Sequence, residues 1–163
     1  MKLNGLKNVI AMLMMSGMLG AAIHARAQDK PADNMQILSD KIRADKKLVV
    51  ATNMELTESE AKEFWPIYTQ YQKELEKINR RIVNLLESYA DDFQKKSLTD
   101  EKAKKLINEA VALDGAEGDL KTIYAPKLSK VLPMRKVLRY LQIENKIRAV
   151  VRYEITSGVP LMR

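Results

Sequence analysis

Two residue types that carry much of protein chemistry are almost absent. The sequence has no cysteine, and its one histidine, His24, lies close to the N-terminus. Without thiols or imidazoles after residue 24, the chain has no disulfide, no Ser/His or Cys/His nucleophile, and no zinc or copper site made from those ligands. Glycine is also rare after residue 27, where it occurs only at positions 115, 118 and 158. The sequence therefore offers no glycine-rich loop for binding phosphate.

Carboxylates are the metal-ligand type that remains. Glu58, Glu60 and Glu63 form one cluster, and Asp91 and Asp92 form another. Such clusters are more typical of a solvated helix face than of a site for a hard cation. No paired acid and base stand out either. We therefore expect no metal, no cofactor and no catalytic residue, and an enzyme that uses only carboxylates and lysines is the weakest class that remains.

The N-terminus has the layout of a secretory signal peptide. Lys2 and Lys7 precede an apolar run over residues 9–23, and Ala25-Arg26-Ala27 is a small-x-small cleavage pattern. The run is shorter than the roughly 20 residues of a membrane span. We expect cleavage after Ala27, with an uncleaved anchor as the alternative. The expected product is a single domain, residues 28–163, in the bacterial periplasm and without a stable membrane span.

The two parts of that domain carry opposite charge. Residues 28–120 hold 15 Lys+Arg and 19 Asp+Glu, whereas residues 121–163 hold 10 Lys+Arg and 2 Asp+Glu. A basic region of this size produces a field that attracts anionic partners. An exported protein rarely meets nucleic acid, so we expect no nucleic-acid binding. Two interpretations stay open. The basic helix lies against acidic helices of its own fold or of a second copy, or it faces an acidic partner, an unfolded chain or an anionic membrane.

The stretch LTESE at residues 56–60 predicts the start of a long helix. Thr57 and Glu60 form a capping box, in which each side chain binds the other residue's backbone N–H, and Leu56 can pack onto Ala61. Beyond this start, apolar residues recur in alternating steps of four and three, which predicts a long helix lying nearly antiparallel along a neighbour. We call these residues the seam: Phe64, Tyr68, Tyr71, Leu75, Ile78, Ile82, Leu85 and Tyr89.

A second helix is predicted to begin at Thr99, where Lys102 replaces the acidic member of a capping box. Its apolar positions are Ala103, Leu106, Ala110, Leu113, Leu120 and Tyr124, with Ile107 and Val111 widening the stripe. Gly115 and Gly118 weaken this helix in its middle. They would also let a neighbouring backbone approach.

A third helix is predicted from Pro133, which suits a first turn, to about Thr156. Its apolar positions are Val137, Leu138, Leu141, Ile143, Ile147, Val150, Val151 and Ile155. A shorter helix is expected within residues 33–54. No segment alternates like a strand, so the predicted class is all-α, with long bent antiparallel helices in a thin hairpin or cradle and no sheet.

Pro66 lies inside the first long helix. An interior proline removes one backbone hydrogen bond and clashes with the carbonyl four residues earlier, which costs about 3 kcal/mol and bends the helix. We expect Pro66 to kink the helix, and Pro126 to act in the same way on the returning chain. The alternative is that Pro66 ends a short first helix. Long paired helices that bend would form a slab with a concave face.

These features together resemble the Spy/CpxP-like LTxxQ-motif proteins of the bacterial periplasm. The motif is itself a capping box, and Glu60 stands where the family has Gln, a change that keeps the capping chemistry. The second copy of the motif is either LTDEK at residues 98–102 or LPMRK at residues 132–136, and neither matches fully. The resemblance covers the layout from Leu38 to Tyr153.

The resemblance implies a thin, bent, all-helical domain that forms a cradle-shaped homodimer. It implies an ATP-independent chaperone or envelope-stress protein whose concave face binds unfolded clients. Metal-sensing relatives bind through histidine, which this chain lacks after residue 27, so that branch is put in doubt. The alternative is a periplasmic regulatory or sensor module that docks its basic helix on one acidic partner.

In the chaperone interpretation, the basic last helix lies on or beside the concave face of a homodimer of bent hairpins and supplies the binding surface. In the alternative, the same helix docks on the acidic partner. Trp65 falls one position off the seam, where a monomer would leave it at the edge. The structural cap consists of Leu56, Thr57 and Glu60. The residues expected to bind a client or partner are Trp65, Arg135, Lys136, Arg139, Tyr140, Arg148 and Arg152.

Overall fold

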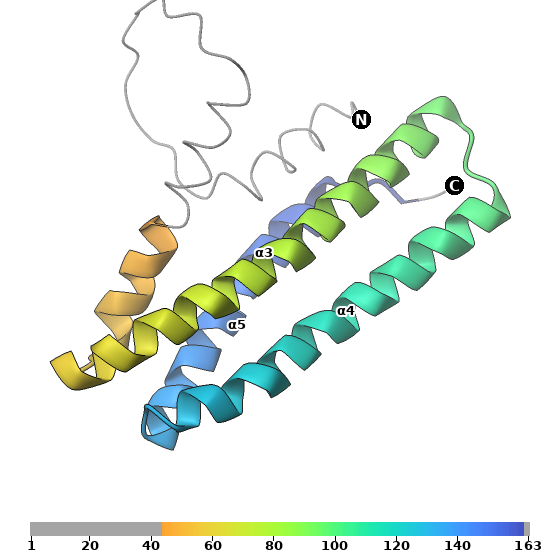
Figure 1. Ribbon diagram of the computed structural model, residues 1–163. Coiled ribbons are helices and arrows are strands. Elements are labelled where there is room, and N and C mark those ends of the chain that lie inside the picture. The colour runs from red at the N-terminus through yellow and green to blue at the C-terminus, as the bar shows by residue number, and fades with distance from the viewer. Residues whose placement is uncertain (1–43, 162–163) are drawn as a thin grey trace, which may run out of the picture.

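The computed structural model describes residues 44–161, apart from the side chains of residues 154–157. This part of the chain consists of a helical segment at residues 44–54 and three longer helices, α3 (Glu58–Lys95), α4 (Asp100–Ser129) and α5 (Met134–Gly158), with no strand (Figure 1). The predicted all-α class is confirmed. The predicted signal peptide at residues 1–27 and the first part of the expected short helix lie outside the described residues.

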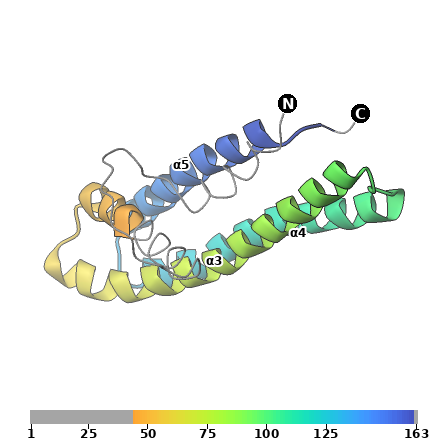
Figure 2. The ribbon, with the colours of Figure 1, turned by 90° about the horizontal axis from the view of Figure 1, so that it is seen from above.

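The helices form two layers. α3 and α4 run antiparallel as a long hairpin, and α5 with the segment 44–54 lies on one face of it (Figure 1). Seen from above, the α3–α4 pair is bowed, and α5 lies on its concave side (Figure 2). The predicted arrangement of long, bent, antiparallel helices in a thin molecule is therefore present within one chain.

Pro66 does not end a helix. α3 continues through it from Glu58 to Lys95, so the alternative of two short helices is wrong. Pro126 likewise lies inside α4, close to its last turn. Pro133 sits just before α5, where its carbonyl accepts hydrogen bonds from the N–H groups of Lys136 and Val137.

The helix ends follow local sequence chemistry. At the start of α3, the Thr57 hydroxyl accepts from the Glu60 N–H at 3.3 Å, and the Glu60 carboxylate accepts from the Thr57 N–H at 2.8 Å, which is the predicted capping box. Thr99 caps α4 by one of these two bonds, because its hydroxyl accepts from the Lys102 N–H and no described side chain returns a bond to the Thr99 N–H. Lys96 ends α3 with a left-handed φ of 52°, and the Ser97 N–H then reaches back to the carbonyl of Asp92. This is a Schellman motif with lysine at a position that glycine usually occupies.

The core is concentrated at one end of the molecule. The first five seam residues, from Phe64 to Ile78, are buried, whereas Ile82, Leu85 and Tyr89 are half-buried. Around the buried end gather Val50 and Met54 of the first segment, the last turns of α4 and the first turns of α5. The buried apolar residues outside the seam are Val50, Met54, Leu113, Leu120, Tyr124, Leu128, Leu132, Val137 and Tyr140.

Several predicted apolar positions face solvent instead. Ile107 and Val111 of α4 are 62% and 67% exposed, and Leu138 and Val150 of α5 are 58% and 64% exposed. The stripes predicted to include them are therefore narrower than the sequence indicated. The glycines of α4 also have no packing role, because a Cβ added at Gly115 or Gly118 would meet no atom within 4 Å. The expectation that they admit a neighbouring backbone is wrong within this chain.

Candidate functional site

The outer face of α5 combines basic and apolar side chains. From Met134 to Tyr153 the only acidic residue is Glu144, and it is fully buried. No carboxylate of that stretch therefore reaches the exposed face. The exposed basic and large apolar residues, which we call the outer face of α5, are Met134, Arg135, Leu138, Arg139, Lys146, Val150, Arg152 and Tyr153.

Some of the basic residues expected to bind a partner are engaged within the chain. Arg139 pairs with Glu55 at 3.0 Å, and Lys136 contacts Glu60 at 2.5 Å and the carbonyl of Glu55 at 2.8 Å. Arg152 pairs with Asp114 of α4 at 2.8 Å. Arg135, by contrast, is exposed and makes no ion pair with another described residue, and the same holds for Lys146.

Two of the predicted binding residues on α5 are buried. Tyr140 is 0% exposed, and its ring contacts Phe64, Tyr68 and Tyr71 in edge-to-face arrangements with centroids 5.2 to 6.1 Å apart. Arg148 is only 7% exposed. The expectation that both belong to an exposed surface is wrong, because they lie on the side of α5 that faces the hairpin.

Trp65 is also more enclosed than expected. Its ring packs edge-on against Phe64 and Tyr68 with centroids 5.0 and 5.2 Å away, and it belongs to the partly buried set around the core. The ammonium of Lys47 lies 4.9 Å from the ring centroid, a distance typical of a cation–π contact. Neighbours in the same chain therefore cover much of Trp65.

The inner face of α5 carries a first polar cluster around Glu144. One carboxylate oxygen accepts from the ammonium of Lys46 at 2.8 Å, and the other accepts from the amide of Gln72 at 2.7 Å. The Gln72 amide also donates to the Tyr140 hydroxyl at 3.3 Å. Burial lowers the pKa of Lys46, and the Glu144 charge opposes that shift. Burial and the Glu144 charge together raise the pKa of Tyr140, so its hydroxyl stays protonated.

One turn further along α5, Arg148 forms a second polar cluster. Its guanidinium donates to the Asn79 side chain of α3 at 2.7 Å and pairs with Glu117 of α4. Arg152 lies 3.3 Å from the second oxygen of Glu117. Burial, and then the charge of Arg152, lower the pKa of Arg148 from 12.5 to about 10, so the guanidinium is charged at neutral pH. Charged groups thus join α5 to α3, α4 and the segment 44–54.

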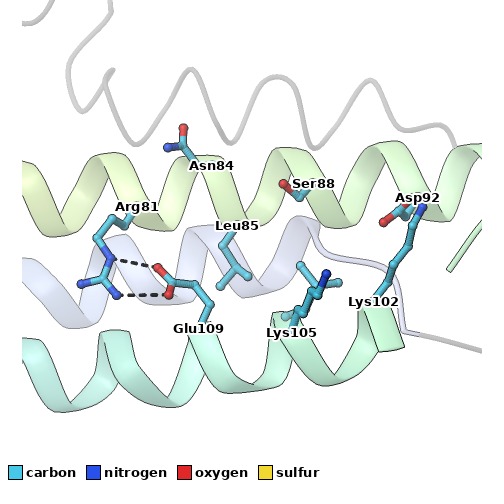
Figure 3. Close-up of a pocket in the computed structure, with 9 residues that line it drawn as sticks. Arg81, Asn84, Leu85, Ser88, Asp92, Lys102, Lys105 and Glu109 are labelled. Atoms are coloured by element: carbon cyan, nitrogen blue, oxygen red, sulfur yellow. Dashed lines mark hydrogen bonds and ion pairs between the residues drawn. The ribbon is translucent and has the colours of Figure 1, made fainter. Parts of the chain in front are cut away.

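A shallow pocket of about 330 Å³ lies between the far halves of α3 and α4 (Figure 3). Leu85 and Leu106 line it together with polar residues. Its charges are mostly neutralised locally, because Arg81 pairs with Glu109 at 2.9 Å and Lys102 pairs with Asp92 at 2.5 Å. The side chains in the pocket form pairs across the hairpin rather than a converging set of acids and bases.

Sequence reasoning missed the buried charges. In the sequence, Glu117 and Glu144 contribute only to the overall charge, and Gln72 and Asn79 belong to no motif. One signal was present. Tyr140, Glu144 and Arg148 follow one another at intervals of four, on the same helical face as the core residue Val137.

No protein-family model, curated protein or solved structure matches the chain. Among the described helices, none is long and apolar enough to span a membrane. Within residues 44–161, no group of three or more histidine, cysteine, aspartate or glutamate residues is arranged to hold a metal ion.

Proposed function

We propose that this chain is an exported, non-enzymatic binding protein of the bacterial periplasm that acts as an ATP-independent chaperone for unfolded clients. The observation that carries the proposal is the outer face of α5, where exposed Leu138, Val150 and Tyr153 lie among exposed basic side chains and no acidic side chain between Met134 and Tyr153 is exposed. Exposed apolar side chains that lie next to one another among polar residues mark interaction sites. On α5, Met134 and Leu138 lie about one turn apart, as do Val150 and Tyr153.

This composition suits clients without a fixed shape. The basic side chains attract acidic stretches of an unfolded chain over long range, and the apolar side chains supply contact area once it arrives. Exposed charges are screened beyond about 8 Å at physiological ionic strength. Binding should therefore be fast, weak and sensitive to salt, which is what a chaperone that needs no ATP requires for release.

The alternative is a regulatory or sensor module that docks α5 on one acidic protein. The ion pairs of Arg139 with Glu55 and of Lys136 with Glu60 favour it in one respect, because they hold those side chains in fixed positions. A fixed charge pattern suits one partner of defined shape better than many. We also propose the homodimer that the resemblance implies, which is compatible with both functions.

The test replaces the outer face and measures aggregation of unrelated clients, such as reduced α-lactalbumin and heat-denatured malate dehydrogenase. The variant carries Arg135→Gln, Lys146→Gln, Leu138→Ser and Val150→Ser. We expect the wild-type protein to suppress aggregation of both clients, more strongly at low salt. The variant should lose most of that protection and its dependence on salt.

The chain offers a matched control on α4. Lys104→Gln, Lys105→Gln, Ile107→Ser and Val111→Ser likewise change two basic and two aliphatic residues, at exposed positions of another helix. This control should protect clients as the wild-type protein does. If the two variants behave alike, the outer face of α5 is not the binding surface. If the wild-type protein protects neither client, the docking module is the better interpretation.

A further inference from the structure

The two halves of α5 are attached to the hairpin by different kinds of contact. Among the described residues, the buried cluster and the apolar residues packed on it include Val137, Tyr140, Leu141 and Ile143 of α5 but none beyond Ile143. Beyond Glu144, ion pairs join Arg148 and Arg152 to α4, and the Tyr89 hydroxyl donates a hydrogen bond of 2.6 Å to the carbonyl of Pro160. No apolar residue described in this part is fully buried, and Ile147 and Val151 are half-buried.

Polar attachment makes the second half easier to release than the first. A buried ion pair gains Coulomb energy but loses hydration, so its net contribution is small, and the charges regain their hydration when they separate. An apolar contact has no such compensation. Val150 and Tyr153, at 64% and 71% exposed, add little burial to this half. Segments with few buried apolar contacts open locally at a lower free energy than the whole fold.

The second half of α5 lies over an apolar part of α3. Arg148 contacts Asn79, and Pro160 contacts Tyr89, so these two α3 residues mark the covered face. Helical periodicity places Ile82 and Leu86 on that face between them, and both are half-buried. Figure 2 shows the same relation, with α5 along the concave side of the α3–α4 pair.

We infer that residues 148–161 form a releasable arm, hinged beyond the fixed Glu144 cluster, and that an apolar segment of an unfolded client takes the arm's place over Ile82 and Leu86. The identity of this occupant rests on the proposed function, whereas the release of the arm does not. The occupant is apolar because the face that the arm uncovers offers apolar side chains. The outer face of α5 binds the client first, and the arm controls access to the apolar surface beneath it.

The test closes the arm chemically and follows amide hydrogen exchange. Asp114→Cys with Arg152→Cys places two thiols where an ion pair of 2.8 Å joins α4 to the arm, and the natural chain has no other thiol. A short bis-maleimide bridges them, and the same variant capped with N-ethylmaleimide is the open reference. In the open protein, amides of residues 148–158 should exchange about 100-fold faster than those of residues 64–78, and bridging should slow them about tenfold or more.

Bridging should also reduce protection of reduced α-lactalbumin relative to the capped protein. The control bridge, Arg81→Cys with Glu109→Cys, joins α3 to α4 across another ion pair and does not touch the arm. It should leave both exchange of the arm and client protection unchanged. A second variant, Arg148→Met with Glu117→Leu, replaces the buried ion pair by apolar side chains and should slow exchange of the arm without any bridge.

The outcomes separate the parts of the inference. If amides of residues 148–158 exchange as slowly as those of residues 64–78 in the open protein, the inference of a releasable arm is wrong, whether or not clients are protected. Fast exchange with unchanged protection after bridging would overturn the apolar client as its replacement. Exchange that slows as protein concentration rises would show that a second copy covers the face instead. If the capped protein protects no client, the proposed function is wrong. The exchange data still show whether the arm opens locally.

Discussion

Tyr140 and Tyr153 lie on opposite faces of the same helix, and their surroundings differ completely. Tyr140 is fully buried among the rings of Phe64, Tyr68 and Tyr71, whereas Tyr153 is 71% exposed. Both tyrosines lie among basic residues in the sequence, so composition alone does not distinguish them. Spacing from Val137 does, because only Tyr140 falls near its helical face.

Tyr140→Ala should lower the free energy of unfolding by about 3–5 kcal/mol, the range for removing a large aromatic side chain from a core. Tyr153→Ala, the matched control on the exposed face, should change it by less than about 0.5 kcal/mol. Urea denaturation followed by circular dichroism measures both. Equal effects of the two substitutions would mean that α5 is rotated about its axis relative to this structure.

Glu60 should make the stability of the fold depend on pH. Its pKa is lowered from 4.5, first by the hydrogen bond from Lys136 and then by that from the Thr57 N–H. A carboxylate with a folded-state pKa below its unfolded value stabilises the fold above the unfolded value, and that contribution disappears as the pH falls through the lowered one.

Glu60→Gln should therefore flatten the loss of stability between about pH 6 and pH 2, the range in which carboxylates titrate. Urea denaturation across that range compares the variant with the wild-type protein. Glu58→Gln removes a negative charge from the same first helical turn and controls for the helix dipole. If the two variants give the same curve, the contacts of Glu60 have no specific role.

At the scale of whole elements, the sequence predicted where helices begin better than it predicted which apolar residues of each helix are buried. The capping residues Thr57 and Thr99 identify helix starts within one residue, because a cap is a local interaction between neighbours in the sequence. Which apolar residues become buried depends instead on where other helices lie. Ile107 and Val111 continue a 3–4 spacing, yet no described helix covers them, so the sequence alone could not show that they stay exposed.

The polar clusters were less predictable than the caps for the same reason. Glu144 is buried because Lys46 and Gln72, which come from two other elements, meet its carboxylate. Arg148 is buried because Asn79 and Glu117 do the same for its guanidinium. A charged residue on an inward face is a weak signal until its partners are located. The fold class therefore followed from the sequence, whereas the inner face of α5 required the structure.

Gly115 and Gly118 give an element-scale prediction. Both are exposed in the middle of α4 and have open space where a Cβ would lie. Glycine in an exposed helix interior costs about 0.8–1 kcal/mol relative to alanine. Gly115→Ala and Gly118→Ala should each raise the free energy of unfolding by about that amount, and the double variant should raise it by about twice as much. Thermal denaturation measures the changes, and destabilisation would show that another molecule packs closely on this face.

At the scale of the whole molecule, burial declines from one end of the hairpin to the other. At the near end, the segment 44–54, α3, α4 and α5 together enclose the aromatic cluster. At the far end, among the described residues, α3 and α4 pack only on each other and on the polar side of α5 (Figure 2). The seam continues through both regions with the same residue types. Its last three residues are half-buried, which leaves apolar surface that the proposed homodimer could cover.

One substitution at two positions of the seam measures this gradient. Leu75 is 3% exposed and Leu85 is half-buried, and both are leucines of the α3 seam. In the monomer, Leu75→Ala should lower the free energy of unfolding by about 3 kcal/mol, within the range for buried leucines, and Leu85→Ala by about 1 kcal/mol, because less surface returns to water. Urea denaturation at several protein concentrations measures both, with sedimentation to give the oligomeric state. A cost of Leu85→Ala that approaches that of Leu75→Ala and grows with concentration would place the interface of a homodimer at the far end. Equal costs that do not depend on concentration would contradict the gradient itself, because they would require the far end to be as enclosed in one chain as the near end.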